Sequence, residues 1–220
     1  MAVRVLAFMA HPDDVEFICA GTLIRLKQEA GCEIAIATAT SGDGGSLETG
    51  PAETARIRHR EAAKAASVLG AEYYCAGCRD LLILYDAPAI RAFTEVVRKA
   101  RPDVVITHSP VDYLVDHENT SRLVRTACFS APVPNLLTGD VDPAPRLSAV
   151  PHLYYADAVE FKGLLGEPIE PQFVVDISSA IEVKEQMLAC HASQRDWLRS
   201  LHKMDHYIEM MKQAGAARGR

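Results

Sequence analysis

The sequence predicts one α/β domain built on a Rossmann-like, doubly wound, mainly parallel sheet with helices on both faces. Short apolar segments alternate with amphipathic ones four times, as in repeated strand and helix units. The shorter segments are almost uniformly apolar, which is typical of strands buried on both faces. With 220 residues and 49% apolar side chains, residues 1–220 can form a single domain with a core on each side of the sheet.

The individual elements follow from this alternation and from the turn residues between the segments. Strands are predicted at residues 3–9, 32–39, 73–75, 104–107, 152–156 and 172–176. Helices are predicted at residues 15–30, 53–69, 88–100, 118–131, 179–190 and 197–211. Gly31 and Gly70 are expected to end the first two helices, and Ser179 with Glu182 forms a capping box before the fifth. Residues 132–171 begin rich in proline and are predicted to form an irregular lid, substrate wall or subunit contact.

Composition narrows the expected partners. The formal net charge is −6, the pI is near 5.7, and the basic residues of the 216–220 tail are too few to predict a nucleic-acid partner. No run is as long as a membrane span and the first residues lack signal-peptide features, so we expect a cytoplasmic protein. Six scattered cysteines indicate reduced thiols. Cys75 and Cys78 have the spacing of a redox pair or half a zinc knuckle, but no second CxxC completes a knuckle.

The most informative stretch is His11-Pro12-Asp13-Asp14, which directly follows the first strand. Pro12 prevents the strand from continuing, so these side chains are expected at the carboxyl edge of the sheet, where ligands bind in open α/β folds. Two adjacent carboxylates repel each other and are costly to bury unless a cation compensates them. His11 and Asp14 are spaced to bind one divalent ion from a turn, while Asp13 faces a bound water. Alternatively, Asp13 or Asp14 caps the following helix and His11 is an ordinary loop histidine.

A second polar loop follows the strand predicted at 104–107. It runs from His108 to His117 and lies at the same edge of a parallel sheet. His117 is therefore the candidate third ligand, which would leave one open position for water, as in catalytic zinc sites. Asp112 and Asp116 can each cap the helix that begins beside His117.

These residues carry a resemblance to a known family. The sequence His-Pro-Asp-Asp-x-Glu at 11–16 resembles the signature of the LmbE-like, or PIG-L, family of metal-dependent de-N-acetylases. Other family positions are matched by Arg58, Glu61, Ala65, Asp116, His117, Lys184, His191, Ser193 and Gln194. Members remove the acetyl group from N-acetylglucosamine (GlcNAc) units carried on inositol, malate, thiol-precursor or lipid aglycones. The resemblance implies a metal held by His11, Asp14 and His117, and a homo-oligomer.

The resemblance also implies residues that contact the substrate. The family arginine at Arg58 reaches the substrate, and the loop that contains Asp43 lines the site. From the residues alone, Arg58 equally fits an ion pair with Glu61 on a solvated helix face. His191 equally fits a helix end, where a histidine interacts favourably with the dipole. We place Asp112 with Arg58, Asp43 and His191 among the residues expected to bind substrate.

One position departs from the family pattern. Leu114 stands where many members carry a histidine that is proposed as proton donor or oxyanion partner and is oriented by the aspartate at Asp116. Because leucine can neither transfer a proton nor donate a hydrogen bond, another residue must take this role. The candidates are Tyr113, His108 and His191. Tyr113 is counted with Asp13 and Asp116 as a candidate catalytic residue, although it also fits a ring packed under the loop.

Together these features predict a zinc-dependent hydrolase that removes an N-acetyl group from a small GlcNAc-containing conjugate. Metal-bound water would be the nucleophile and Asp13 the general base. Other divalent metals such as Fe²⁺ also fit these ligands. The alternatives are an amidase for another amide, such as a thiol conjugate, and a non-catalytic, metal-stabilised carbohydrate-binding protein. A nucleotide binder is disfavoured because no phosphate-binding glycine loop is present.

Overall fold

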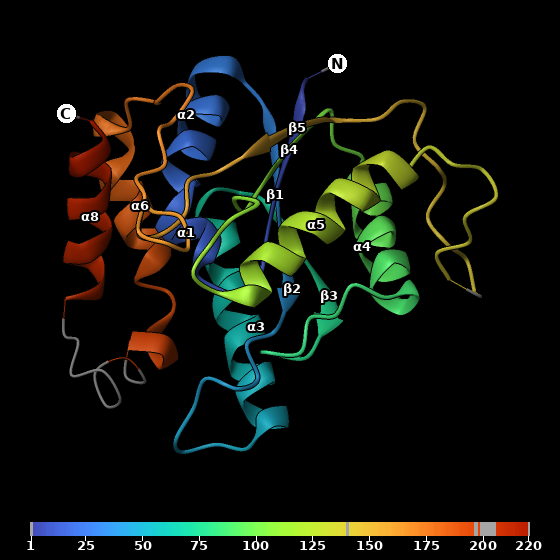
Figure 1. Ribbon diagram of the computed structural model, residues 1–220, viewed down its shortest axis with the longest axis horizontal. Coiled ribbons are helices and arrows are strands. Elements are labelled where there is room, and N and C mark those ends of the chain that lie inside the picture. The colour runs from blue at the N-terminus through green and yellow to red at the C-terminus, as the bar shows by residue number, and fades with distance from the viewer. Residues whose placement is uncertain (1, 140, 196–197, 199–205, 220) are drawn as a thin grey trace.

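The computed structural model describes residues 2–139, 141–195, 198 and 206–219. Within them, five strands form one sheet in the order β3-β2-β1-β4-β5, and every neighbouring pair is parallel (Figure 1). The strands are β1 Arg4–Met9, β2 Glu33–Thr40, β3 Glu72–Cys78, β4 Val104–Thr107 and β5 His152–Tyr155. The predicted Rossmann-like, parallel α/β class is therefore confirmed.

Helices cover both faces of this sheet (Figure 1). The α-helices are α1 Asp14–Ile18, α2 Ala20–Ala30, α3 Pro51–Val68, α4 Ala87–Ala100, α5 Val115–Ser130, α6 Ile181–Leu188 and α8 Tyr207–Arg218. Helices α4 and α5 pack on one face, while α1, α2, α3 and α6 pack on the other. Helix α8 lies outside α6 and contacts it.

The alternation of β1 builds the two cores. Leu6 and Phe8 point toward α4 and α5, and Phe8 stacks on Phe93 of α4 with ring centroids 4.7 Å apart. Val5 and Met9 point toward α1 and α2. Since successive side chains of a strand face opposite sides, the central strand has to be apolar on both sides, and it is so from Val5 to Met9.

Several predicted elements differ from the observed ones. The helix predicted at 15–30 is divided at Cys19, where α1 ends and α2 begins. Residues 172–176 are not a strand, and their apolar side chains are exposed. The capping box is also wrong, because a 3-10 turn, Ser178–Ala180, leads into α6 and no side chain caps that helix. The last helix was predicted at 197–211, but residues 197 and 199–205 lie outside the described part of the chain. The observed helix α8 begins at Tyr207 and extends beyond the predicted end, to Arg218.

Two further predictions, for Gly31 and for the pair Cys75 and Cys78, can be compared with the structure. Gly31 ends α2 in the left-handed conformation at φ 64°, as predicted. Cys75 and Cys78 are both free; Cys75 contacts Ser41, with 3.4 Å between Sγ and Oγ, whereas Cys78 packs against the α4 side of the sheet. The two side chains therefore lie on opposite faces of β3, which does not support a redox pair.

Helix α4 holds the first part of the irregular 132–171 region. The buried guanidinium of Arg98 donates to the carbonyl oxygens of Ala131, Val133 and Leu136 at 2.8–3.0 Å. One turn away, the carboxylate of Glu95 accepts from the Ala144 amide at 3.1 Å. Two side chains of α4 thus provide hydrogen-bond partners for backbone groups of this irregular segment, which has no helix or strand to satisfy them.

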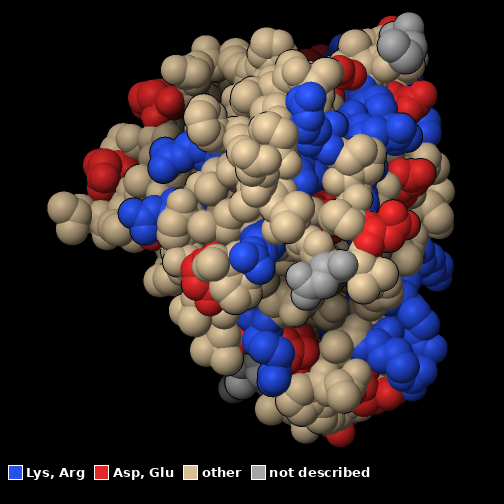
Figure 2. All heavy atoms as spheres, turned by 90° about the vertical axis from the view of Figure 1, so that its right-hand side faces the viewer, with Lys and Arg blue, Asp and Glu red and all other residues tan. Residues whose placement is uncertain are grey.

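The outer surface carries charges of both signs. On the face shown in Figure 2, basic and acidic side chains are interspersed, and most of the surface is formed by uncharged residues. None of the described helices is both long and apolar enough to cross a membrane.

Candidate metal centre

The candidate centre lies between the carboxyl ends of β1 and β4. These two strands are neighbours, but the chain first builds β2 and β3 on one side of β1 and only then returns to place β4 on the other. This is the switch point at which open α/β sheets bind ligands, because the adjacent loops diverge there. His11 follows β1, and His117 lies in the first turn of α5 after β4.

The turn after β1 orders its own side chains. The His11 backbone N–H donates to Asp14 Oδ2 at 2.7 Å, which folds the Asp14 carboxylate back toward the strand end. Asp13 adopts φ 102° and ψ −24° and makes no capping hydrogen bond to α1 within the described structure. The alternative in which Asp13 caps this helix is therefore wrong, and its carboxylate has other partners.

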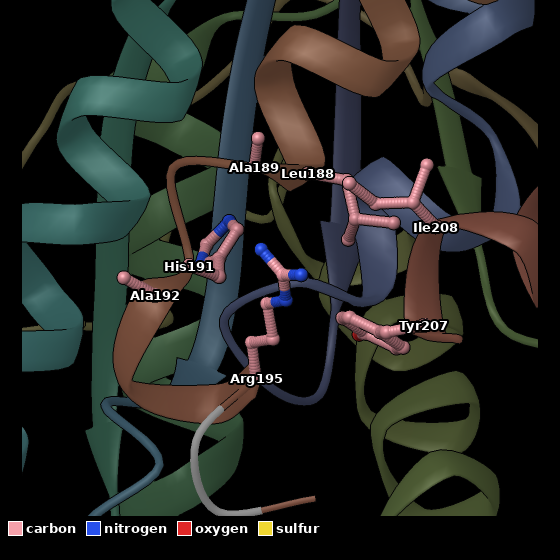
Figure 3. Close-up of a pocket in the computed structure, with 7 residues that line it drawn as sticks. All are labelled: Leu188, Ala189, His191, Ala192, Arg195, Tyr207 and Ile208. Atoms are coloured by element: carbon pink, nitrogen blue, oxygen red, sulfur yellow. The ribbon is translucent and has the colours of Figure 1, made fainter. Parts of the chain in front are cut away.

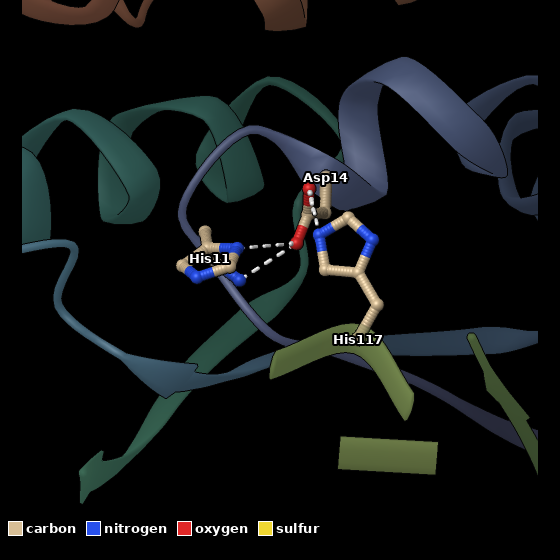
Figure 4. A group of neighbouring side chains, drawn as sticks. All are labelled: His11, Asp14 and His117. Carbon is tan, nitrogen blue, oxygen red and sulfur yellow. Dashed lines mark hydrogen bonds and ion pairs between the residues drawn. The ribbon is translucent and has the colours of Figure 1, made fainter. Parts of the chain in front are cut away.

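The three predicted ligands converge. Asp14 Oδ2 lies 3.3 Å from His11 Nδ1, and Asp14 Oδ1 lies 3.5 Å from His117 Nε2 (Figure 4). One ligand atom from each residue lies within 4.8 Å of the others. A tetrahedral zinc ion with ligands at about 2.0–2.1 Å separates them by roughly 3.3–3.4 Å. Two imidazoles and a carboxylate at these distances therefore fit a divalent cation.

Further carboxylates orient both imidazoles. Asp112 Oδ1 lies 3.0 Å from His117 Nδ1, which leaves Nε2 of that ring directed at Asp14. Asp116 Oδ2 lies 3.2 Å from His11 Nε2 and also accepts from the Leu81 amide at 2.8 Å. Such carboxylate partners fix the tautomer and ring orientation of a metal-binding histidine.

The electrostatics match this arrangement. Burial lowers the pKa of His11, but its contacts with Asp116, Asp14 and Asp80 outweigh this and raise the pKa well above 6.5. Burial likewise lowers the pKa of His117, and the charge of Asp14 with the bond to Asp112 raises it above the ordinary value. Burial raises the pKa of Asp14, yet the surrounding histidines bring it well below its usual range. Without a metal, protons on the histidines compensate the buried carboxylates.

Comparison with known proteins identifies the family. The family described as "PIG-L: GlcNAc-PI de-N-acetylase" matches residues 6–128, which include most of β1, all of β4 and all three candidate ligands. The chain belongs to the PIG-L family. It is thus assigned to a family of hydrolases that remove N-acetyl groups.

Individual PIG-L relatives match most of this chain and about three quarters of their own length. A diacetylchitobiose deacetylase of Thermococcus kodakarensis is 26% identical over 197 residues, which cover 87% of this chain and 70% of the relative. The structure of an N,N'-diacetylchitobiose deacetylase from Pyrococcus horikoshii is 25% identical, with a TM-score of 0.74 over 95% of this chain and 78% of that one.

The same fold also carries other chemistry. GalB, a 4-carboxy-2-hydroxymuconate hydratase from Pseudomonas putida KT2440, has a TM-score of 0.77 at 23% identity and covers 99% of this chain and 86% of its own. At this identity the likeness concerns the fold alone, so the chemistry of this PIG-L chain has to be argued from its site.

Arg58, the family arginine on α3, is buried and points into the centre. Its guanidinium donates to the carbonyl oxygens of Pro12 at 2.7 Å and Gly42 at 3.1 Å, and Nη2 lies 3.4 Å from Asp13 Oδ1. Gly42 has φ 65°, and a Cβ there would lie 2.1 Å from Arg58 Nη1, so only glycine fits. The alternative ion pair with Glu61 is wrong, because Glu61 instead accepts from the Ser193 amide at 2.9 Å.

The other predicted substrate contacts have protein partners as well. Asp43 accepts from the Asp80 amide at 2.8 Å and from Arg79 Nε at 2.6 Å, so it holds the chain beyond β3. His191 is buried after α6, with Nε2 3.4 Å from Glu16 Oε2. A role of either residue in binding substrate stays a prediction.

The loop before α5 contains the departure at Leu114, which is partly buried and precedes the first residue of that helix. Tyr113 is 56% exposed, and its ring stands edge-on to His117 with centroids 5.6 Å apart. Burial of its hydroxyl raises the pKa of Tyr113 above its ordinary value, so the hydroxyl keeps its proton at neutral pH.

The contacts of His108 do not favour it as the proton donor, since its Nε2 also lies 3.2 Å from Asp14 Oδ2. It is fully buried, and its Nε2 accepts the Ala10 amide at 2.9 Å. The neutral ring must then carry its proton on Nδ1, directed away from that bond. Burial and the neighbouring His117 charge lower the pKa of His108 to about 4. An uncharged imidazole with its acceptor nitrogen occupied cannot donate from that position at neutral pH.

Two further residues of the centre were not predicted. Asp80 Oδ1 lies 3.2 Å from His11 Nε2, and the Tyr207 hydroxyl donates to Asp13 Oδ2 at 2.9 Å. Asp80 follows β3 at the same carboxyl edge as the other loops, which is the one sequence signal that could have indicated it. Tyr207 belongs to a surface-type helix pattern and carries no such signal.

Protonation of the two histidines predicts an unusual pH dependence for the metal-free protein. A raised pKa in the folded state stabilises the fold below the unfolded pKa, and this contribution is lost as the pH rises through the folded value. We therefore expect the Tm of metal-free protein to fall as the pH rises above about 6.5. Added zinc should remove this fall, since the ion takes the place of the protons. Thermal unfolding across this range with a chelator and with zinc tests it; a metal-free Tm that rises with pH would contradict it.

Proposed function

We propose that the chain is a zinc-dependent hydrolase that removes the N-acetyl group of a small GlcNAc-containing conjugate. The observation that carries this proposal is the placement of Asp13. Its buried carboxylate lies beside the group formed by His11, Asp14 and His117, but its contacts are Arg58 and Tyr207 rather than the ligand nitrogens. A purely binding centre has no use for a second carboxylate held in this way.

His11 Nδ1, a carboxylate oxygen of Asp14 and His117 Nε2 would hold the ion. When bound, a divalent cation polarises the amide carbonyl and lowers the pKa of a coordinated water from ~16 to ~7. Zinc suits two imidazoles and one carboxylate, and Fe²⁺ fits the same donors. The carboxylates of Asp112 and Asp116 keep the two imidazoles turned toward Asp14.

Asp13 would move the protons. It accepts a proton from the attacking water as the carbon–oxygen bond forms, and it returns a proton to the nitrogen as the carbon–nitrogen bond breaks, so that acetate and an amine result. Burial raises the pKa of Asp13, while the charge of Arg58 and the Tyr207 hydroxyl act in the opposite direction. A carboxyl group whose pKa is raised takes up a proton more readily, which suits such a shuttle.

The tetrahedral oxyanion needs a donor because Leu114 offers none. We assign this role to the protonated hydroxyl of Tyr113, whose partly exposed ring lies edge-on to the buried His117. Loss of one oxyanion donor typically lowers kcat by ~10²–10³-fold. Arg58, Asp43 and His191 remain the residues proposed to surround the sugar, and Asp112, predicted beside them, is now proposed to orient His117 instead.

Residues 132–171 are proposed to form a lid or a contact in a homo-oligomer. Exposed apolar side chains support this, including Leu137, Val141 and the 96% exposed Leu165. Apolar surface of this kind on an irregular segment is typical of a surface that another chain or a ligand covers.

Substrate profiling of the zinc-loaded protein tests the proposed function. N-acetylglucosamine conjugates with sugar, inositol, malate and lipid aglycones are compared with a thiol-conjugate amide and with an unsaturated dicarboxylate. Release of free amine and acetate from the first group supports the proposal. Cleavage of only the thiol conjugate favours an amidase that acts on another amide. Hydration of the dicarboxylate favours a hydratase. Sugar binding without amine release favours a carbohydrate-binding protein.

A further inference from the structure

The C-terminal helix reaches the candidate centre through its first residue. Tyr207 begins α8, and in the view of Figure 3 the Arg195 side chain lies between the Tyr207 ring and His191; all three line one pocket. The ring stacks on Phe17 of α1, with centroids 5.6 Å apart and planes 20° apart. Its hydroxyl donates to Asp13 Oδ2 at 2.9 Å, across 194 positions of sequence.

Both oxygens of the Asp13 carboxylate therefore have a side-chain partner. Oδ1 faces Arg58 Nη2 at 3.4 Å, and Oδ2 accepts from Tyr207. The backbone of Asp13, at φ 102°, lies in a region that L-residues rarely adopt. Such a conformation persists only where surrounding contacts hold it in place.

Arg58 and Tyr207 bind different oxygens of the Asp13 carboxylate. The Arg58 guanidinium also donates to the carbonyl oxygens of Pro12 and Gly42, and its contact with Asp13 is to Oδ1. The Tyr207 hydroxyl holds the other oxygen, Oδ2, from the side of α8. Each carboxylate oxygen has two lone-pair positions, so a single donation from Tyr207 leaves Oδ2 able to accept another proton.

We propose that Tyr207 is a positioning residue that holds the Asp13 carboxylate in the orientation from which it can act as the general base. Helix α8 then contributes a functional residue to the centre in addition to packing on α6. This inference rests on the proposed function, since it assigns Tyr207 a role through the base named there. Neither the sequence motifs nor the family match, which ends at residue 128, points to this residue.

Replacement of Tyr207 by phenylalanine tests the role, because it keeps the ring that stacks on Phe17 and removes the hydroxyl. We expect kcat to fall by about tenfold or more, with KM, zinc content and Tm little changed, since misplacement of a reacting group by ~1 Å can cost ~10²-fold. Tyr74→Phe is the matched control. It removes a hydroxyl that donates to the Glu72 carboxylate at 2.6 Å, on the edge strand β3, and kcat should not change.

A double-mutant comparison separates positioning from a general structural effect. If Tyr207 acts through Asp13, Tyr207→Phe should cause no further loss of kcat in an Asp13→Asn background, because the two changes disturb one unit. An equal tenfold loss in both backgrounds would overturn the proposal. So would an unchanged kcat in the single variant.

Hydrogen exchange of α8 provides a readout that needs no substrate. In metal-free protein, Asp13→Ala and Tyr207→Phe should each speed exchange of the Met210 amide by about tenfold, since a hydrogen bond to a charged group contributes roughly that factor. This amide closes the first turn of α8 by donating to the His206 carbonyl oxygen at 2.8 Å. Tyr74→Phe should leave its exchange unchanged. Unchanged exchange in both variants would refute the tie between α8 and Asp13. Faster exchange in a protein that cleaves no amide would support the tie and count against the proposed function instead.

Discussion

Asp13→Ala is expected to lower kcat by about 10²–10⁴-fold while the protein still binds one zinc ion. The carboxylate contacts Arg58 and Tyr207 and makes no described contact with the ligand nitrogens, so its removal leaves the metal-binding atoms in place. The reaction then lacks the group that takes up the proton of water. The measurement is kcat for amine release beside the zinc content of dialysed protein.

Two further variants make the Asp13 result specific. Asp13→Asn keeps the size of the side chain and should lose a comparable amount of activity, which separates basicity from packing. Asp103→Ala removes a carboxylate at the opposite edge of the sheet, where it accepts the Arg4 amide at 2.9 Å, and should retain kcat. If Asp13→Ala kept kcat within about threefold of wild type, general-base catalysis by Asp13, worth ~10²-fold or more, would be excluded.

His117→Ala is expected to abolish zinc binding as well as turnover. The ring supplies the one ligand nitrogen that comes from the β4 side of the centre, and Asp112 already fixes its orientation. Because loss of an orienting partner alone costs ~10–100-fold in metal affinity, loss of the ligand should cost more than ~100-fold. Zinc affinity measured by competition with a chelator tests this expectation.

The same measurement of zinc affinity compares the contributions of the residues around His117. Asp112→Asn should weaken zinc binding by about 10–100-fold, an intermediate effect. His59→Ala is the control, since His59 is an exposed imidazole on α3 that lies edge-on to Tyr73. Equal zinc affinity in wild type and His117→Ala would place the ion elsewhere, for example on His11 with Asp80 and Asp116.

The sheet could be predicted because its signal is local. β1 and β4 are buried over most of their length, so their sequences are apolar apart from Arg4 at the start of β1 and Thr107 at the end of β4, and β4 was predicted at its observed bounds of 104–107. Residues 172–176 have a similar apolar run, yet Phe173 and Val174 are exposed and pair with no strand. A short apolar run alone does not reveal whether a partner strand is available.

The convergence of the three candidate ligands could be predicted for a related reason. His11 and Asp14 belong to one turn, and His117 follows another strand that ends at the same sheet edge. Asp80 and Tyr207 could not be found in this way. Asp80 reaches His11 from a loop in which Leu81 takes a left-handed backbone conformation at φ 61° and donates its amide to Asp116. Tyr207 depends on how α6 and α8 pack, which no local pattern in the sequence describes.

The most direct test of a zinc-dependent de-N-acetylase is the release of amine from a panel of N-acetylglucosamine conjugates by metal-stripped protein, before and after zinc is restored. We expect no amine before zinc is added, amine release after it, and no recovery in Asp13→Ala or His117→Ala. Amine release that is unaffected by stripping, or that survives in His117→Ala, would contradict the assignment of His11, Asp14 and His117 as the metal centre.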